Sequence, residues 1–379
     1  MKVLLIASPN LYGRGGEVRS YEIIKRLRNF KADISLLTDL TNESVLWKLS
    51  NHVSEILKVK CPNNNEICIA LLIKKISHLS DKNIDLIVSH SEHPRYALSA
   101  FYIAKLLKRP WTAIINSYIY LYPYSYGASI SRVLRNTFAF NCLNTTIVHL
   151  VSHTIQYELQ KRGFGFKYFD ILEVPVGISW EKVKNAEKTR VVKKYDLAFM
   201  GALSIEKGIF DLAYIIYKLK KKLHRDVKAV LIGEFNNSSE KNRYLTLLKK
   251  LDLYNNIIFK GYLTGEVKYL ELAKAKLFVF PSKVDIFSIS MLEALAMRLP
   301  VIVFDLPFAW EFKTDAVVKV KSLDEYVDVI FNLLNNDEER EKLGKLGNLY
   351  AKRYTWENAA YHEYKAYLKT IKWWLYEAK

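Results

Sequence analysis

Short apolar runs alternate with segments of helical periodicity along nearly the whole chain, and this alternation constrains the fold more than any other feature. In the first half such runs stand at 3–8, 32–38, 83–90, 111–117 and 145–152. The first of them, VLLIAS, is short, apolar and followed by turn residues, as a buried parallel strand is. Alternating strands and helices predict a parallel sheet with right-handed crossovers.

The pattern starts again after a charged segment at 181–194, with apolar runs at 195–202, 228–235, 256–262, 277–282 and 301–305. A chain of 379 residues also exceeds the roughly 250–300 residues that one core reaches. We therefore predict an α/β protein of two Rossmann-like doubly wound domains, 1–186 and 187–355, followed by a C-terminal helix at 356–379. Two such domains would face a cleft, because ligands of parallel sheets bind beyond the carboxyl ends of the strands.

The chain is strongly basic, with 57 Lys and Arg against 39 Asp and Glu, a formal charge of +18. Nucleic acid, an anionic membrane surface and phosphorylated small molecules are all partners that this charge allows. The alternative is a lysine-rich background without a role. The terminal IKWWLYEAK also suits a lipid surface, although the packed end of a helix explains it better.

Cysteine usage and the N-terminus indicate a compartment. Cys61, Cys68 and Cys142 show no CxxC spacing and are odd in number, so we expect neither a disulfide framework nor a zinc site, and a reducing compartment. The apolar part of MKVLLIASP is too short for a signal peptide. No run reaches the ~18 apolar residues of a membrane span. We predict a cytoplasmic protein that can contact the inner face of a membrane.

A candidate site stands in PSKVDIFSISMLEALAMRLPV, residues 281–301. Ser288 suits a helix N-cap, and the amides of Ile289 and Ser290 behind it would form an anion site. Asp285 before the cap and Glu293 one turn inside are poor phosphate ligands but good acceptors from hydroxyl groups. Together these groups fit a nucleoside diphosphate sugar. The alternative is an ordinary strand–loop–helix joint, since acids are favoured near helix N-termini.

Glycines and a lysine after the predicted strands add to this site. Gly201, Gly233 and Gly261 each close a strand of the second half, and a flat base could lie against the backbone at Gly233 and Gly261. Lys207 follows Gly201 in the next loop and could reach a phosphate as a point charge. In the first half, Gly16 in RGGE follows the first strand, where its backbone can approach a ligand closely.

Taken in order, the motifs resemble one family: GG after the first strand, VPVGI at 174–178, then FMGALSIEKG, VLIGE, IFKGY and PSxxDxFSxxxxEAxAxxxPVI. The sequence resembles the GT-B glycosyltransferases of family four, which are retaining enzymes that use nucleotide sugars. The resemblance covers nearly the whole chain and is strongest over 195–305. It implies that the terminal helix crosses back onto the first domain.

The resemblance also implies roles for single residues. Glu293 would bind the ribose, Asp285 would contact the transferred sugar, Lys207 would bind the diphosphate and the Gly16 amide would face the same phosphates. The implied reaction moves a hexose to a glycan or lipid-linked hydroxyl with retention, the leaving phosphate helping to deprotonate the acceptor. Lys207 and the helix amides would stabilise the developing charge. No cofactor or metal is expected, because no DxD motif and no His/Asp cluster with ligand spacing stands in the sequence.

The sequence departs from the family pattern at four positions. Ala202 stands where Arg is usual, so one phosphate contact is missing unless another cation, such as Arg19, replaces it. Asp285 stands where Glu is usual, and Asn116 where a histidine often stands. Arg298 replaces a common glycine at the end of the acidic helix, a change that costs ~1 kcal/mol if the position is left-handed.

The acceptor side is less defined. His90 and Asn116 each follow a predicted strand of the first domain, and a tyrosine-rich segment occupies 117–127. These residues could border the acceptor, or they could be a satisfied histidine and a surface loop. Two other functions stay open: a glucosyltransferase acting on DNA, and a catalytically weak nucleotide-sugar-binding protein. The sequence has no helix-turn-helix, zinc-finger or RRM signature, which argues against nucleic acid as a partner.

Overall fold

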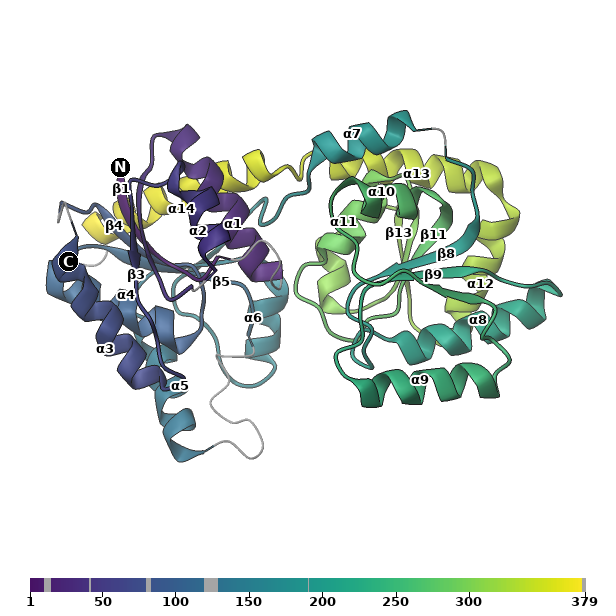
Figure 1. Ribbon diagram of the computed structural model, residues 1–379, viewed down its shortest axis with the longest axis horizontal. Coiled ribbons are helices and arrows are strands. Elements are labelled where there is room, and N and C mark those ends of the chain that lie inside the picture. Colours follow the sequence, from purple (N-terminus) through teal and green to yellow (C-terminus); the bar gives the residue numbers. More distant parts are fainter. Residues whose placement is uncertain (10–14, 41, 80–82, 119–128, 190, 377–379) are drawn as a thin grey trace. The chain divides into compact units, whose positions relative to one another are not determined.

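The structure, a computed structural model, describes residues 1–9, 15–40, 42–79, 83–118, 129–189 and 191–376 (Figure 1). It divides into two compact units: unit 1 is Met1–Gly177 with Trp356–Lys379, and unit 2 is Ile178–Thr355. The domain boundary predicted after residue 186 lies inside helix α7 (Trp180–Lys188). This helix packs against α10 (Gly265–Ala273) of unit 2, so the charged segment at 181–194 belongs to that unit.

Unit 1 is built on one parallel sheet of seven strands in the order β3-β2-β1-β4-β5-β6-β7. The central strands are buried on both faces; Val3 to Ile6 of β1 have no exposed surface. The strands are β1 (Lys2–Ile6), β2 (Asp33–Thr38), β3 (Glu55–Lys58), β4 (Leu86–Ser89), β5 (Trp111–Ile115), β6 (Val148–Leu150) and β7 (Phe169–Ile171). The helices between them are α1 (Gly15–Leu27), α2 (Glu43–Ser50), α3 (Asn65–Lys75), α4 (Pro94–Leu107), α5 (Ile130–Leu143) and α6 (His153–Gln160), with short 3-10 turns at Arg28–Phe30 and Ile76–His78.

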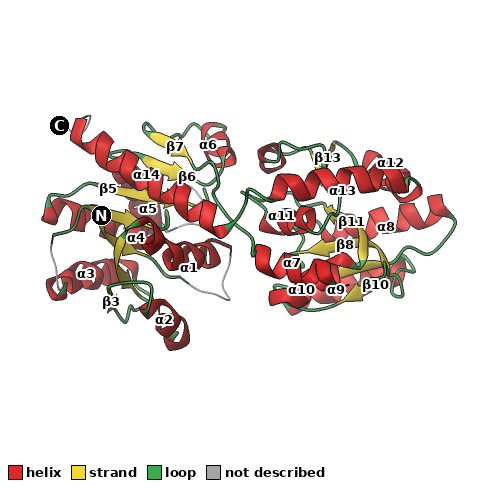
Figure 2. Cartoon of the chain, turned by 90° about the horizontal axis from the view of Figure 1, so that it is seen from above, coloured by secondary structure: helices red, strands yellow, loops and turns green. Residues whose placement is uncertain are grey.

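The C-terminal helix α14 (Trp356–Tyr376) belongs to unit 1, where it packs against α1 and β5. Figure 2 shows it lying across that unit. Thr370 bonds to the buried ring of His149 at 2.8 Å, and the ring of Trp373 lies 5.2 Å from that of Tyr168. The predicted return of the terminal helix to the first domain is therefore confirmed. The contact of Trp373 with Tyr168 fits the explanation that the Trp residues belong to a packed helix end.

Unit 2 repeats the architecture with six parallel strands in the order β10-β9-β8-β11-β12-β13. They are β8 (Tyr195–Met200), β9 (Ala229–Ile232), β10 (Ile257–Phe259), β11 (Ala275–Phe280), β12 (Val301–Phe304) and β13 (Val317–Val320). Its remaining helices are α8 (Ile209–Leu223), α9 (Ser238–Lys250), α11 (Ile289–Ala296), α12 (Leu323–Asn335) and α13 (Asp337–Ala351), with a 3-10 turn at Pro307–Glu311. The two doubly wound domains are confirmed.

The strand orders locate a switch point in each sheet. In unit 1 the chain winds outward in both directions from β1 and β4, and in unit 2 from β8 and β11. Loops at the carboxyl ends of such strand pairs part to opposite faces and leave room for a ligand. Most of the predicted site residues follow these strands, and Asn116, Gly233 and Gly261 follow the neighbouring strands β5, β9 and β10. None of the described helices combines the length and the apolar character that crossing a bilayer would need.

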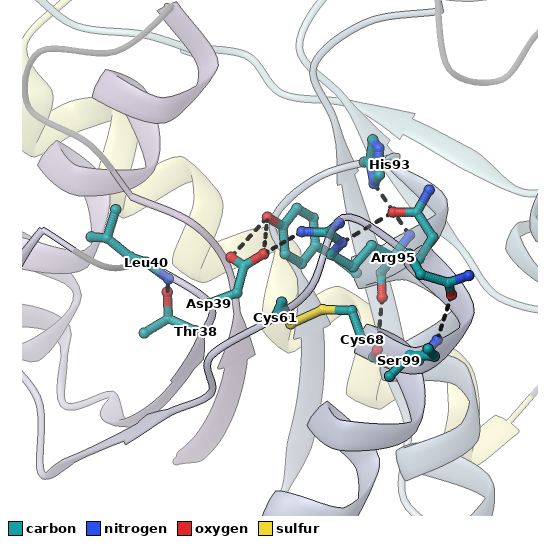
Figure 3. Close-up of a disulfide and its surroundings, with 12 residues drawn as sticks. Thr38, Asp39, Leu40, Cys61, Cys68, His93, Arg95 and Ser99 are labelled. Atoms are coloured by element: carbon teal, nitrogen blue, oxygen red, sulfur yellow. Dashed lines mark hydrogen bonds and ion pairs between the residues drawn. A yellow bond between two sulfur atoms is a disulfide. The ribbon is translucent and has the colours of Figure 1, made fainter.

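A disulfide joins Cys61 and Cys68, with Cα atoms 5.0 Å apart (Figure 3). The expectation of unpaired cysteines was wrong, because the chain turns back after β3 and brings Cys61 against the first turns of α3. Donor atoms of Asp39 and both sulfurs lie within 4.8 Å of one another. Cys142 is free and buried.

Candidate active site

The three predicted strand-end glycines of unit 2 lie next to one another. The Gly201 amide donates to the Ile232 carbonyl at 3.0 Å, and the Gly233 amide donates to the Gly261 carbonyl at 2.8 Å. A Cβ on Gly233 would fall 1.9 Å from the Gly201 carbonyl oxygen, so only glycine fits there. Gly261 has φ +65° and open space where a Cβ would stand. The carboxyl ends of β8, β9 and β10 thus bring three glycine backbones side by side, with the rings of Phe199 and Phe280 next to Gly201.

The loop after β8 approaches the loop after β11 closely at Gly208. This residue is left-handed, with φ +76°, and a Cβ on it would meet the Pro281 carbonyl oxygen at 1.9 Å. As a result Lys207 reaches across: its Nζ donates to the Val284 carbonyl and to Asp285 Oδ2, both at 2.9 Å. The structure therefore joins in one ion pair the two residues expected to bind diphosphate and sugar.

The N-terminus of α11 lies directly beyond this pair. Ser288 caps the helix by accepting from the Met291 amide at 3.4 Å, and its hydroxyl lies 3.0 Å from that of Ser290. The predicted N-cap is confirmed. The amides of Ile289 and Ser290 lie in the first turn of the helix, where no helical carbonyl is available four residues earlier to accept from them. They are therefore the groups at this end that can donate to an anion.

Glu293 lies in the second turn of α11 and is 5% exposed. Its Oε1 accepts from Lys268 Nζ at 2.6 Å and from the Tyr269 hydroxyl at 2.9 Å. Neither partner was predicted from the sequence. The available signal was a Lys-Tyr pair in the helix that follows Gly261, but nothing in the sequence indicates that this helix faces α11.

Each acid of the site is thus paired with one lysine. The side chains of Lys207 and Asp285 are 25% and 18% exposed, and those of Lys268 and Glu293 are 22% and 7% exposed. Partly exposed ion pairs are held weakly enough to exchange partners. A phosphate could therefore take Lys207 from Asp285 and leave that carboxylate to accept from hydroxyl groups.

Arg19, the candidate to replace the arginine absent at Ala202, is buried and paired inside unit 1, so it does not supply that cation. Arg19 is 1% exposed; its Nε donates to the Pro175 carbonyl at 2.6 Å and its Nη2 to Glu363 Oε2 at 2.5 Å. Burial alone would raise the pKa of Glu363, but Arg19 and His90 outweigh it and hold that pKa well below its usual range. The arginine holds α14 in place within unit 1.

His90 belongs to the same buried cluster. Its ring nitrogens lie 2.6 Å from Ser20 Oγ and 2.5 Å from Glu363 Oε1, and the residue is 2% exposed. The ring is therefore satisfied inside unit 1 and does not border an acceptor. Of the two roles considered for His90, that of a histidine with satisfied hydrogen bonds fits the structure. The acceptor-side role is replaced by a structural one.

Gly16 and Asn116 lie together at the carboxyl edge of unit 1. The Cβ position of Gly16 is 3.6 Å from Asn116 Cβ, and the Asn116 amide side chain donates to the His90 carbonyl at 3.1 Å. The Asn116 backbone amide donates to Glu92 Oε2 at 2.9 Å, and burial raises the pKa of Glu92 to about 7. Of the tyrosine-rich segment 117–127, residues 119–127 lie outside the described part of the chain.

Comparisons with known proteins agree with this geometry. Residues 181–349 match the family described as Glycosyl transferases group 1. The chain is 29% identical over 248 residues to a Bacillus subtilis (strain 168) protein named for glycosyl transfer in teichuronic acid biosynthesis, covering 62% of this chain and 57% of that protein. It is 27% identical over 176 residues to the poly(ribitol-phosphate) alpha-N-acetylglucosaminyltransferase of Staphylococcus aureus (strain COL), covering 45% and 34%. The chain thus spans little more than half of the first relative and a third of the second.

Among solved structures, the crystal structure of Anabaena HepE in complex with UDP superposes with a TM-score of 0.73 at 16% identity, covering 97% of this chain and 100% of that one. This likeness confirms the GT-B fold. The match to a glycosyltransferase family and to two proteins named for glycosyl transfer supports a transferase enzyme.

Proposed function

We propose that the protein is a retaining glycosyltransferase that moves a hexose from a nucleoside diphosphate sugar to a hydroxyl of a glycan or lipid-linked acceptor. One observation carries the proposal. The Lys207–Asp285 pair, 2.9 Å apart, stands beside the serine-capped start of α11, with Glu293 one turn further in. A cation, helix amides and two carboxylates in this order match a diphosphate between two groups that carry hydroxyls.

In the proposed reaction the bond between the anomeric carbon and the diphosphate breaks, and its electron pair goes to the phosphate oxygen. Lys207 leaves Asp285 for that phosphate, and the Ile289 and Ser290 amides share the developing charge. Such preorganised donors act most where charge forms. The acceptor oxygen bonds to the same face of the sugar, its proton passes to the leaving phosphate, and the anomeric configuration is retained.

The two carboxylates read the donor on either side of the diphosphate. Asp285, freed from Lys207, accepts from hydroxyls of the transferred hexose. Glu293 accepts from the ribose, held in place by Lys268 and Tyr269. The base lies against the glycine ends of β9 and β10. UDP in the HepE complex supports a nucleoside diphosphate as the bound group. No metal takes part in this proposal, because Lys207 and the amides supply the positive charge.

The names of the two relatives and the charge of the chain bear on the acceptor and the location. The two names each mention an anionic polymer, teichuronic acid in one and poly(ribitol-phosphate) in the other. A glycan or lipid-linked acceptor with negative charge suits a chain of charge +18. We propose that the protein works at the cytoplasmic face of a membrane.

A thermal-shift screen across UDP, GDP and ADP sugars tests the proposal. A donor at 100 times its dissociation constant stabilises the protein by about 2.7 kcal/mol, and Glu293→Gln removes most of that shift. Glu341→Gln on the exposed face of α13 is the matched control and keeps it. The anomeric configuration of the product, read by NMR, tests retention. If no donor shifts the wild type and no transfer is detected, the proposed function is wrong.

A further inference from the structure

One face of α5 in unit 1 carries large apolar side chains in solvent. Ile130, Leu134 and Phe138 are 79%, 65% and 46% exposed. Their spacing of four residues places them one above another on the same side of the helix. Apolar side chains scattered singly on a surface need no explanation, but a row of three does.

The row continues onto the neighbouring helix. Tyr102 and Leu106 of α4 are 39% and 63% exposed, and the rings of Tyr102 and Phe138 stack with centroids 6.4 Å apart. Helices α3, α4 and α5 pack in that order (Figure 1). These five residues, Tyr102, Leu106, Ile130, Leu134 and Phe138, form one surface, which we call the α4–α5 surface.

An apolar groove adjoins this surface at Leu106. It has a volume of about 430 Å³ and lies between the end of α3 and α4. Its lining is Ile73, Lys74, Ile76, Ser77, Leu79, Leu106 and Leu107. The α4–α5 surface therefore ends in a hollow whose walls are mostly hydrocarbon, with a lysine among them.

The charge around the surface has one sign. From residue 93 to residue 157 the sequence contains no Asp or Glu, although the chain has 39 of them. Both α4 and α5 lie inside this interval. Lys74, Lys105 and Lys108 stand around Leu106, and the structure shows no ion pair for them among its described residues. The acid at the start of α3, Glu66, forms an ion pair with Arg135 of α5 at 2.8 Å.

We propose that the α4–α5 surface binds an anionic lipid bilayer. Its apolar side chains enter the boundary between headgroups and acyl chains, and the lysines meet lipid phosphates. An anionic bilayer explains why Asp and Glu are absent from α4 and α5, because its headgroups would repel each carboxylate. A protein partner would not require two whole helices to lack acidic residues. This proposal extends the proposed function, since it places the acceptor-side unit where a lipid-linked acceptor lies.

Sedimentation with vesicles tests the proposal. The protein is mixed, without any donor, with vesicles of phosphatidylcholine alone or of equimolar phosphatidylcholine and phosphatidylglycerol. We expect binding to the anionic vesicles, weakened by salt. Leu134→Ser reduces that binding by at least about tenfold, and the double variant Lys105→Glu with Lys108→Glu removes the preference for phosphatidylglycerol.

Leu349→Ser is the matched control, because Leu349 lies on α13 of unit 2 and is 66% exposed, as much as Leu134. It binds vesicles like the wild type. Equal binding to both vesicle types, or unchanged binding by Leu134→Ser, overturns the proposal. A concentration-dependent dimer that Leu134→Ser abolishes, with no vesicle binding, shows a protein interface and overturns it too.

The two proposals fail separately. Vesicle binding is measured without turnover, so its loss says nothing about the donor site. Conversely, Leu134→Ser keeps its donor thermal shift and its activity on a water-soluble acceptor. Absence of any donor shift with intact vesicle binding rejects the proposed function and leaves the α4–α5 surface standing.

Discussion

The two units share a doubly wound parallel sheet, yet they use its carboxyl edge in opposite ways. In unit 1, part of the edge at β1 and β4 is filled by the chain itself: Arg19, His90 and Glu363 form a buried cluster. In unit 2 the equivalent edge at β8 and β11 keeps glycines and the partly exposed Lys207–Asp285 pair. The topology places a possible site at the carboxyl edge of both sheets. The side chains at each edge determine whether its charged groups are buried or remain accessible to a ligand.

Burial explains why the two edges behave differently. Charges inside unit 1 have lost their water and depend on one another, so each must keep its partner. The pair in unit 2 retains contact with solvent and can exchange its partner for a ligand at little cost. We therefore expect substitutions in the first cluster to affect stability, and substitutions in the second pair to affect activity.

The largest expected effect is in the buried cluster. Glu363→Ala leaves Arg19 and His90 without their carboxylate and destabilises unit 1 by about 3–5 kcal/mol. Urea unfolding measures this loss. Glu357→Ala on the same helix is the control: its ion pair with Arg26 is 63% exposed on the Glu357 side, and its loss costs about 0–1 kcal/mol. If both variants unfold at the same urea concentration, the contrast between buried and exposed charges is wrong.

The second effect separates activity from stability. Lys207→Ala removes the cation proposed to meet the leaving diphosphate and lowers turnover by about 10²–10³-fold, while the urea midpoint changes little. Initial rates with a saturating donor measure this. Lys342→Ala, an exposed lysine of α13, keeps full activity. A Lys207→Ala enzyme as fast as the wild type removes Lys207 from the mechanism.

The smallest effect is a pH dependence confined to unit 1. Burial lowers the pKa of His149 from 6.5 to about 4. Between pH 6.5 and about pH 4, His149 is therefore protonated in the unfolded chain but neutral in the folded unit. Because the unfolded state binds the additional proton, the free energy of unfolding falls as the pH falls through this window. The slope reaches about 1.4 kcal/mol per pH unit.

Comparing wild type with His149→Gln isolates this contribution, because the pKa of Glu92 is raised to about 7 and works in the opposite direction. The difference between their unfolding free energies shrinks as pH falls from 6.5 to 4. His149 belongs to unit 1, and the histidine of unit 2, His224, is not altered. The substitution therefore leaves the unfolding of unit 2 unchanged. A difference that is constant with pH would show that His149 titrates normally.

Local features of the site were predictable from the sequence. The strand expected at 228–235 is observed as Ala229–Ile232, and Ser288 caps α11 as expected. Arg298, at a position where glycine is common, is left-handed with φ +59°, as the pattern indicated. Each of these features depends on residues a few positions apart, and short-range sterics and capping bonds decide them.

Partners across long distances in the chain were not predictable. Lys207 and Asp285 are separated by 78 positions, and Arg19 and Glu363 by 344. Arg19 does not fill the role considered for it, because α14 returns to unit 1 and covers it. The disulfide of Cys61 and Cys68 was missed although they are only seven residues apart, because spacing does not show that a loop turns back on itself.

The sequence by itself determined the repeated alternation of strands and helices, the switch points that follow from it, and the residue types after each strand. These depend on hydrophobic periodicity and local backbone preference, which every segment carries within itself. Only the tertiary structure decided which of those residues meet, which are buried, and which edge stays open. Packing brings distant segments together, and burial then sets the cost of leaving a charge without a partner.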